Sequence, residues 1–376
     1  MDDLGEAPRE HPERRFHARR HRDRARRGRS GLLHAGIHGA LASETSGSRE
    51  NHGGWRFREE GASRSHVSEE KITLPAFAKI NLGLRVRGRR ADGYHEISTV
   101  FQTVTLHDKL TFEAGPDERL ELVCSDPDIP TDQSNLVLRA ALALRERYDV
   151  SRGARVSLEK RIPAGGGLGG GSSDAAVALV ALARLWEIKT DVLELSALGA
   201  RLGADVPFFL AGGTALGTGT GTDITPLEDA PKMHLVVVTP GVRVSTAEAY
   251  KLLNAPALTK ETAVVNLSVS RAEAEFSGFL RGVTSNDFEA VVVRLQPEVG
   301  RARAALWGVG ARRAMLSGSG SSVFGVFESK GEAGLAREVL KAEGDWQVFA
   351  CATLTRAEYM RELGRCAAVL RPSRGA

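Results

Sequence analysis

The sequence has few cysteines and no long hydrophobic run, and both shortages exclude classes of protein. Its three cysteines, Cys124, Cys351 and Cys366, are odd in number, lie far apart and include no C-x-x-C pair. This spacing argues against a disulfide framework and against a structural zinc site, so a reducing cytoplasm is the simplest compartment. No window approaches the roughly 18 uninterrupted apolar residues of a membrane-spanning helix, and no membrane partner is expected.

Lysine is absent from the first 66 residues, which differ in composition from the rest. The segment holds 14 Arg and 10 acidic residues, and seven of the ten His. It accounts for the whole formal net charge of +4, because 37 basic and 37 acidic residues remain in 67–376. Since it cannot bury enough apolar surface to offset the entropy of ordering, we predict that 1–66 is a disordered, Arg-rich extension.

Three interpretations of this extension compete. An Arg-rich tail could bind nucleic acid or a membrane surface. A transit peptide would also be rich in Arg and Ser, but its acidic content should be low. We favour a third hypothesis, in which translation starts near Val67 and 1–66 is an over-extended start, because arginine without lysine is typical of translated GC-rich DNA.

The whole chain of 376 residues has the composition of a soluble globular protein, with 42% hydrophobic and 26% charged residues. Irregularly alternating patterns predict an α+β or mixed fold with a domain boundary near 226–232. The expected strands are 72–86, 100–112, 156–162, 235–238, 314–316, 323–327 and 347–353. The expected helices are 134–148, a long one ending near 186, 191–202, 285–295 and 331–343.

The strongest motif is the segment Pro163 to Ala175, PAGGGLGGGSSDA, which has six glycines in seven positions between a strand and a helix. Such a loop lets backbone N–H groups converge on a phosphate at a helix N-terminus. Ser172 and Ser173 are candidates to cap the helix or to supply a hydroxyl to phosphate or Mg²⁺. A flexible linker would not open directly into an apolar helix, so the sequence favours a phosphate cradle.

Two better-known cradles fit this loop poorly. A P-loop requires Lys after the last glycine, and none follows. The letters from Gly165 to Gly170 match the dinucleotide fingerprint, but about 90 residues of core precede them. Asp191, the acidic residue at roughly the right spacing, is expected to cap a helix instead.

Three segments, two of them rich in glycine, together resemble the GHMP kinases (galactose, homoserine, mevalonate and phosphomevalonate kinases). They are 75–82, 163–173 and 316–322. The segments AKINL (78–82), RADGYH (90–95) and GADVPF (203–208) resemble one branch in particular, which phosphorylates the 2-hydroxyl of 4-diphosphocytidyl-2-C-methyl-D-erythritol with ATP and Mg²⁺ in the non-mevalonate isoprenoid-precursor pathway. The resemblance implies a small-molecule kinase, monomeric or homodimeric, without a nucleic-acid partner.

The resemblance also implies a fold. It predicts an N-terminal ATP-binding domain, 67–228, with a ribosomal-protein-S5-domain-2-like fold. A ferredoxin-like C-terminal domain, 229–372, would carry the third glycine motif and close the cleft.

Two charged residues are the catalytic candidates that the resemblance implies. Asp205 would accept the proton of the substrate hydroxyl, and Lys79 would pair with Asp205 and stabilise charge during transfer. From the residues alone, Asp205 is a turn or C-cap residue. Lys79, inside an apolar strand, would need a partner or would face solvent on an edge strand.

Further residues are implied around the ligands. The ATP site would comprise Asn135 and the loop Pro163, Ala164, Gly165, Gly166, Gly167, Leu168, Gly169, Gly170, Gly171, Ser172 and Ser173; Asn135 could equally be a plain helix cap. The substrate would contact Asn81, Tyr94, His95, Tyr250, Gly318, Ser319 and Gly320. Tyr250 would hold the cytosine from the side opposite the Tyr94–His95 pair, although Tyr94 could also be a hairpin residue packed on a neighbour.

Three rival functions stay open at this point. A GHMP kinase for another alcohol, such as mevalonate or homoserine, would not need an aromatic pair. A nicotinamide oxidoreductase would bind NAD. A nucleic-acid-binding protein would depend on 1–66, and its affinity would fall steeply with salt.

Overall fold

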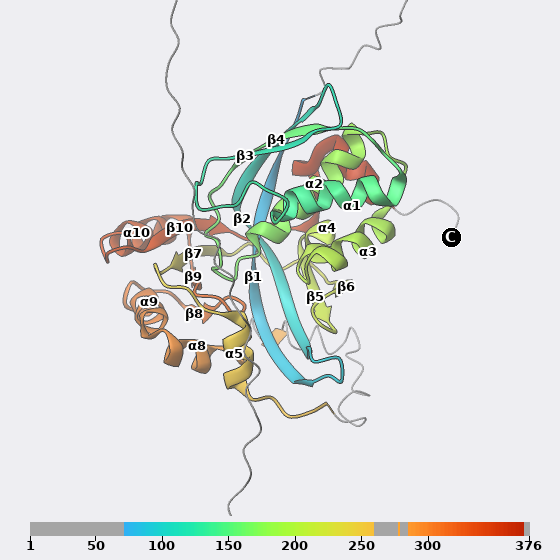
Figure 1. Cartoon of the computed structure of the whole chain (residues 1–376). Coiled ribbons are helices and arrows are strands. Elements are labelled where there is room, and N and C mark those ends of the chain that lie inside the picture. Colours follow the sequence, from blue (N-terminus) through green and yellow to red (C-terminus); the bar gives the residue numbers. More distant parts are fainter. Residues whose placement is uncertain (1–70, 259–276, 279–284, 372–376) are drawn as a thin grey trace, which may run out of the picture. The chain divides into compact units, whose positions relative to one another are not determined.

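The computed structural model describes residues 71–258, 277–278 and 285–371, all within one compact unit that starts at Arg64. The predicted extension 1–66 and the proposed start near Val67 therefore lie outside the described residues. The described part contains two β-sheets, each with helices on its outer face (Figure 1). This arrangement confirms the α+β prediction.

The first sheet is built around one long hairpin. Strand β2 is its centre, because β1, β4 and β5 all pair with it in antiparallel fashion, while β3 runs parallel to β4. The strands are β1 (Lys71–Arg89), β2 (His95–Ala114), β3 (Leu120–Cys124), β4 (Ala154–Glu159), β5 (Thr214–Thr218) and β6 (Asp223–Pro226).

A layer of helices covers the outer face of this sheet (Figure 1). Their apolar sides pack on Phe77, Phe101 and Phe112 of the hairpin and form the first hydrophobic core. Helix α2 lies at the centre of this layer, because nearly every residue along it is buried. The helices are α1 (Leu136–Tyr148), α2 (Gly170–Leu185), α3 (Val192–Leu202) and α4 (Val206–Ala211).

The second sheet is antiparallel, with the strand order β10-β7-β9-β8. This is the ferredoxin-like order that the resemblance implies. Its strands are β7 (His234–Thr239), β8 (Arg313–Leu316), β9 (Val323–Phe327) and β10 (Gln347–Ala352). Helices packed on its outer core are α5 (Thr246–Leu253), α8 (Glu289–Leu295), α9 (Pro297–Gly308) and α10 (Lys330–Leu340).

A third core joins the inner faces of the two sheets. Ile80 and Leu82 of β1 meet Val237 and Phe324 of the second sheet there. Because side chains alternate along a strand, Lys79 is directed to the opposite face of β1. The hairpin register shifts next to it, between Phe77 and Lys79 and again between Asn81 and Gly83. Such bulges re-aim side chains and are frequent beside functional sites.

The end of the described chain returns to the first sheet. Helix α11 (Arg356–Leu363) and the 3₁₀ helix η1 (Gly364–Leu370) follow the last strand and pack into the first core. Tyr359 is fully buried there, and its hydroxyl donates to the carbonyl of Phe209 on α4. The residues after β10 thus stabilise the N-terminal helical layer.

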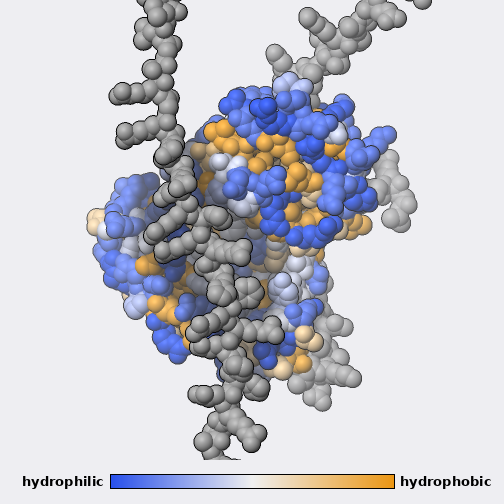
Figure 2. Space-filling model, in the orientation of Figure 1, coloured by the Kyte–Doolittle hydropathy of each residue, from blue (hydrophilic) through white to orange (hydrophobic). Residues whose placement is uncertain are grey.

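The surface carries few large apolar side chains. In Figure 2 hydrophilic residues surround the hydrophobic ones on the visible face. The exposed large apolar residues are distributed over several elements: Tyr94, Val123, Leu193, Leu252, Trp307, Leu335 and Val339. No helix among the described residues has the length and apolar character needed to span a membrane.

The expected strands and helices are all present, with ends displaced by a few residues. The elements not predicted are β3, β5, β6, α4, α5, α9, α11 and η1. Helix α3 ends at Leu202, and Pro207 lies in the first turn of α4, where proline is well tolerated.

Tyr359 provides a test of the docked C-terminal segment. Tyr359→Ala should lower the free energy of unfolding by about 3–5 kcal/mol, because a large buried ring is removed. Tyr359→Phe should cost only about 1 kcal/mol, the contribution of one hydrogen bond. Urea unfolding of both variants measures the difference. Equal stability of the Ala variant and the parent protein would show that this segment does not support the first core.

Candidate functional site

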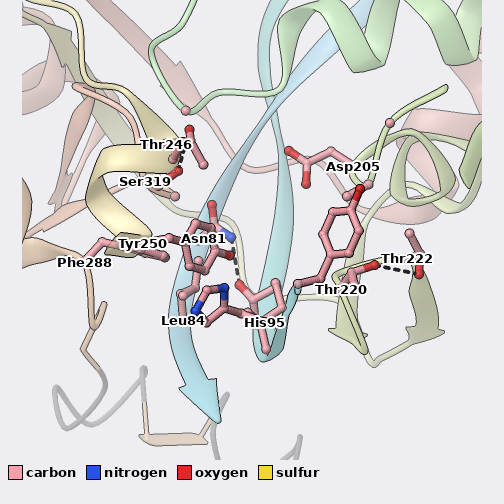
Figure 3. Close-up of a pocket in the computed structure, with 18 of the residues that line it drawn as sticks. Asn81, Leu84, His95, Asp205, Thr220, Thr222, Thr246, Tyr250, Phe288 and Ser319 are labelled. Atoms are coloured by element: carbon pink, nitrogen blue, oxygen red, sulfur yellow. Dashed lines mark hydrogen bonds between the residues drawn. The ribbon is translucent and has the colours of Figure 1, made fainter. Parts of the chain in front are cut away.

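One large pocket of about 1470 Å³ lies between the hairpin β1–β2, the helices α3–α4 and helix α5. In Figure 3 Tyr250 and Phe288 enter from one side of the pocket, and Asp205 enters from the other. Many of the residues predicted from the sequence line it: Lys79, Asn81, Tyr94, His95, Gly167, Ser172, Asp205, Tyr250, Gly318 and Ser319. Gly320 and the rest of the glycine loop lie outside the lining.

The predicted pair of Lys79 and Asp205 is present. The Lys79 ammonium lies 3.4 Å from a carboxylate oxygen of Asp205 and donates to the amide oxygen of Asn81 at 2.8 Å. The Lys79 side chain is only 4% exposed, whereas that of Asp205 is 31% exposed. The alternative of an edge-strand lysine facing solvent is therefore wrong. The buried cation holds a carboxylate that remains accessible from the pocket.

Local backbone structure leaves the Asp205 carboxylate free for this contact. Asp205 occupies the N-cap position of α4, where a side chain commonly accepts a backbone N–H. It makes no such bond, and its backbone is already in the helical region. The C-cap interpretation is also wrong, because α3 ends at Leu202 with Gly203 as its C-cap.

A chain of hydrogen bonds between β1 and β2 orients the Lys79 side chain. The amide nitrogen of Asn81 donates to the hydroxyl of Thr99 at 2.7 Å, and Thr99 donates to the carbonyl of Gly83. Asn81 is 1% exposed and uses both ends of its amide in this way. It holds Lys79 in place. Thr99 was not predicted from the sequence, because a threonine inside a strand is common.

The glycine loop is shaped by left-handed backbone. Gly165, Gly167 and Gly169 have φ values of 72°, 81° and 73°, which favour residues without a Cβ. The carbonyl of Leu168 accepts the backbone N–H of Lys79 at 2.9 Å. The loop is therefore attached directly to the strand residue that carries the buried ammonium.

The two glycine motifs touch each other. Ser317 donates its hydroxyl to the carbonyl of Gly167, and the backbone N–H of Ser322 donates to the carbonyl of Gly166. A Cβ on Gly167 would lie 2.3 Å from the Ser317 carbonyl oxygen, and a Cβ on Gly320 would lie 2.3 Å from the Gly167 nitrogen. Only glycine permits this approach, which joins the two sheets at the rim of the pocket.

The structure confirms only part of the roles predicted for Ser172, Ser173 and Asn135. Helix α2 begins at Gly170 with Gly169 as N-cap, so neither Ser172 nor Ser173 caps it, which corrects that expectation. Ser172 lines the pocket, whereas the hydroxyl of Ser173 is buried without a hydrogen-bond partner. Asn135 is the cap of α1 and accepts the N–H of Val137, which confirms the plain-cap interpretation; a contact to adenine stays a prediction.

An aromatic wall forms the side of the pocket opposite Asp205. The rings of His95 and Tyr250 are stacked, with centroids 4.5 Å apart and planes inclined by 24°, so they leave no room for a base between them. The prediction that Tyr250 lies opposite His95 across the cytosine is therefore wrong. Phe288 packs edge-on against Tyr250. Burial, and then the nearby charge of Arg89, lower the pKa of His95 below its ordinary value, so its ring is neutral at pH 7. Burial, and then the charge of Asp205, raise the pKa of Tyr250 to about 12.

Tyr94 is 67% exposed at the tip of the hairpin and lines the pocket, so among the described residues it is not packed as the hairpin alternative requires. The turn that carries it is held by Arg90, which forms ion pairs with Asp92 and Glu96. The sequence pattern missed Phe288, because nothing local marks it as a pocket residue.

The charges along the pocket favour an anionic ligand. Its lining contains the cations Lys79, Arg89, Arg90, Arg201 and Lys251 against the two carboxylates Asp92 and Asp205. Among the described residues no group of three or more His, Cys, Asp or Glu is placed to hold a metal ion. A cation bound here would need ligands from an anionic partner such as a phosphate.

Comparisons with known proteins agree with this geometry. Two family models match, the GHMP kinases N terminal domain over residues 135–213 and the GHMP kinases C terminal domain over 270–345. A 4-diphosphocytidyl-2-C-methyl-D-erythritol kinase of Prosthecochloris aestuarii is 43% identical over 274 residues, which cover 73% of this chain and 95% of the relative. One of Pseudomonas entomophila is 44% identical over 265 residues, covering 70% and 87%.

Solved structures give the same result. A crystal structure of 4-(cytidine 5'-diphospho)-2C-methyl-D-erythritol kinase superposes with a TM-score of 0.63 at 38% identity, covering 75% of this chain and 100% of that one. A homoserine kinase from Cytophaga hutchinsonii has a TM-score of 0.59 at 20% identity, covering 77% and 96%. The second likeness shows the fold alone.

Two glycines of one loop offer a matched test of the contact between the motifs. Gly167→Ala should destabilise the protein by about 2 kcal/mol or more, because strained left-handed backbone is combined with a clash against the Ser317 carbonyl. Gly165→Ala has similar backbone strain but open space around its Cβ, so it should cost about 1 kcal/mol. Thermal unfolding distinguishes them, and equal losses would mean that the motif contact contributes nothing.

Proposed function

The chain belongs to the 4-diphosphocytidyl-2-C-methyl-D-erythritol kinases of the GHMP kinase family, and from this premise we propose the roles of its residues. It is an ATP-dependent small-molecule kinase of the non-mevalonate isoprenoid-precursor pathway. It phosphorylates the 2-hydroxyl of 4-diphosphocytidyl-2-C-methyl-D-erythritol. The observation that carries the residue assignment is the Lys79–Asp205 pair, which lies in the pocket beside the glycine loop and faces an aromatic wall.

We assign the triphosphate of ATP to the glycine loop, 163–173, with Asn135 near the adenine. Glycines with left-handed backbone at 165, 167 and 169 permit the kind of turn in which backbone N–H groups converge on an anion. Helix α2 begins at Gly170, within the last residues of the loop, and its N-terminus favours negative charge. The excess of cations along the pocket supports two phosphorylated ligands in one site.

Magnesium fits this site as an ion carried largely by the nucleotide. Mg²⁺ usually retains several waters and is bound by one or two carboxylates together with substrate phosphates. The Ser172 hydroxyl, which lines the pocket, is the side chain that would hold it, and Asp205 stays free to act as base. When bound, the ion neutralises charge on the transferred phosphoryl group.

Asp205 is the proposed base, and Lys79 stabilises charge. A carboxylate that makes no cap bond and is partly exposed to the pocket can approach a bound hydroxyl and accept its proton. The Lys79 ammonium, fixed by Asn81 and the Asp205 carboxylate, cannot rotate away to solvent. It therefore presents a preorganised positive charge where negative charge develops.

The aromatic wall is the proposed cytidine site. The neutral His95 ring and the Tyr250 ring offer flat faces and polar edges, which suit a pyrimidine. Tyr94, exposed at the hairpin tip, is placed to cover the base from the mouth of the pocket. Gly318–Gly320 would contact the sugar-alcohol end, since Gly318 lies close to Lys79 and Asn81. These features favour a nucleotide-bearing substrate over mevalonate or homoserine.

The remaining assignments are proposals as well. We place the boundary between the N-terminal domain 67–228 and the C-terminal domain 229–372 in the connection between β6 and β7, with residues after Thr355 packed on the first domain. We also propose a cytoplasmic enzyme, monomeric or homodimeric, that does not depend on nucleic acid.

The first test is ADP release by the full chain with three alcohols in parallel. Diphosphocytidyl-methylerythritol should support turnover, whereas mevalonate and homoserine should not. Asp205→Asn should lower kcat by about 10²–10⁴-fold, the usual contribution of a positioned base, while ATP binding persists. Comparable turnover with mevalonate or homoserine would contradict the substrate, and an active Asn variant would contradict the base.

A second test concerns the aromatic wall. Tyr250→Leu should raise KM for the cytidyl substrate by about tenfold, because an aromatic stack on a base contributes roughly 1–3 kcal/mol. KM for ATP should stay within about twofold, since the proposed ATP site is the glycine loop and not the aromatic wall. Leu252→Ala on the same helix, whose side chain is exposed, is the control. Equal KM changes for both ligands would move the cytidine site elsewhere.

A further inference from the structure

A second buried ionic cluster lies beneath the glycine loop and outside the pocket. The ammonium of Lys160 contacts the carboxylates of both Asp108 and Asp174, and it lies 3.2 Å from the latter. The side chain of Lys160 is 6% exposed, that of Asp108 is 0% exposed and that of Asp174 is 4% exposed. None of the three residues lines the pocket, and the proposed mechanism does not use them.

The cluster is attached to both ends of the loop. One carboxylate oxygen of Asp108 accepts the backbone N–H groups of Arg161 and Ile162, which directly precede Pro163. Asp174 lies in the second turn of α2, just after the loop. A Cβ on Gly170 would lie 2.8 Å from the Lys160 ammonium, so the start of the helix lies directly against this cluster.

Counting donors shows where a proton must lie. Two carboxylates share a single ammonium, and burying both as anions would leave an uncompensated charge, which is costly. Asp108 has three donors, two backbone N–H groups and Lys160, and these stabilise its ionised form. Asp174 has a single donor, Lys160, besides a side-chain contact with Asp108, and its Oδ1 has no hydrogen-bond partner. The proton therefore belongs on Asp174.

The electrostatics of the surroundings agree. Burial raises the pKa of Asp174 well above its ordinary value; the charge of Lys160 opposes this shift and that of Asp108 adds to it. Burial lowers the pKa of Lys160, but the two carboxylates outweigh it and the net shift is upward. From β3 the thiol of Cys124 also faces this cluster, and burial raises its pKa, so it stays neutral.

We propose that Asp108, Lys160 and a protonated Asp174 form a clasp that fixes the entrance and the exit of the glycine loop and so positions the loop for ATP. The clasp rests on the proposed assignment of this loop to ATP. Its members are positioning residues, because they act through the backbone of the loop and touch no reacting atom.

Two pairs of variants test the clasp kinetically. Asp174→Ala should raise KM for ATP about tenfold, because the exit of the loop loses its anchor, whereas Asp174→Asn, which mimics the protonated acid, should restore it to within about twofold. Lys160→Met should raise KM for ATP at least as much. Lys109→Met is the matched control. Lys109 follows Asp108 on β2 and forms an exposed ion pair with Glu159, the residue of β4 that precedes Lys160. KM for the cytidyl substrate should change little in all four.

A loss of folded protein alone would lower kcat without changing either KM, so the KM for ATP separates positioning from stability. If Asp174→Asn behaves like Asp174→Ala, or if Lys160→Met leaves KM for ATP unchanged, the clasp is refuted. If the parent protein does not bind ATP at all, the proposed function fails instead, and thermal unfolding then tests the clasp alone.

The pH dependence of unfolding is that independent measurement. An acid with a raised pKa in the folded state contributes stability that is fully present below its unfolded pKa, near 3.8, and is lost as the pH rises toward the folded pKa. The amide of the Asp174→Asn variant does not titrate, so that variant keeps its stability over this range. The Tm of Asp174→Asn minus that of the parent should therefore increase steadily from pH 5 to 8. A difference that does not change with pH would show that Asp174 is ionised and would overturn the proposal.

Discussion

The pocket depends on one buried ammonium group. Lys79 lies in the middle of an apolar strand, and a charge in that position is tolerated only with close partners. Asn81, two residues along the same strand, supplies an amide oxygen, and Asp205, at the start of α4, supplies the counter-charge. The demand for partners thus brings together residues 126 positions apart in the chain. It also explains why the hairpin β1–β2 and the helical layer meet at this point.

The second constraint is the contact between two glycine motifs from different sheets. Backbone atoms of Gly166 and Gly167 approach those of Ser317 and Gly320 so closely that a Cβ on either side would collide with them. This contact sets the width of the pocket rim. The glycine loop is also attached to β1, because the backbone N–H of Lys79 donates to the carbonyl of Leu168. Positioning of a phosphate loop and burial of a lysine are therefore parts of one arrangement.

Much of the fold and site could be read from the sequence where a signal is long or unusual. Six glycines in seven positions have few physical uses, and the order of motifs around 79, 165 and 205 indicated the family. Short elements such as β5 and α4 were not predicted, whereas the equally short β8 and β9 were marked by runs of apolar residues. The stacking of Tyr250 on His95 was not foreseen, because the two residues lie 155 positions apart in the chain. Thr99, Phe288 and Lys160 were missed for the same reason: their surroundings are tertiary.

The two buried lysines show how similar chemistry serves different ends. Lys160 meets two fully buried carboxylates, and the surplus negative charge is resolved by a proton, which leaves a neutral cluster with no opening to the pocket. Lys79 meets only one carboxylate, and that carboxylate is 31% exposed to the pocket. A single exposed partner leaves Asp205 able to exchange its contact with Lys79 for one with a ligand. Lys160, closed in on both sides, has no such freedom. The two lysines therefore differ in the number of carboxylates around the ammonium and in the access of those carboxylates to solvent. Lys160 is a positioning residue, whereas Lys79 can stabilise charge during phosphoryl transfer.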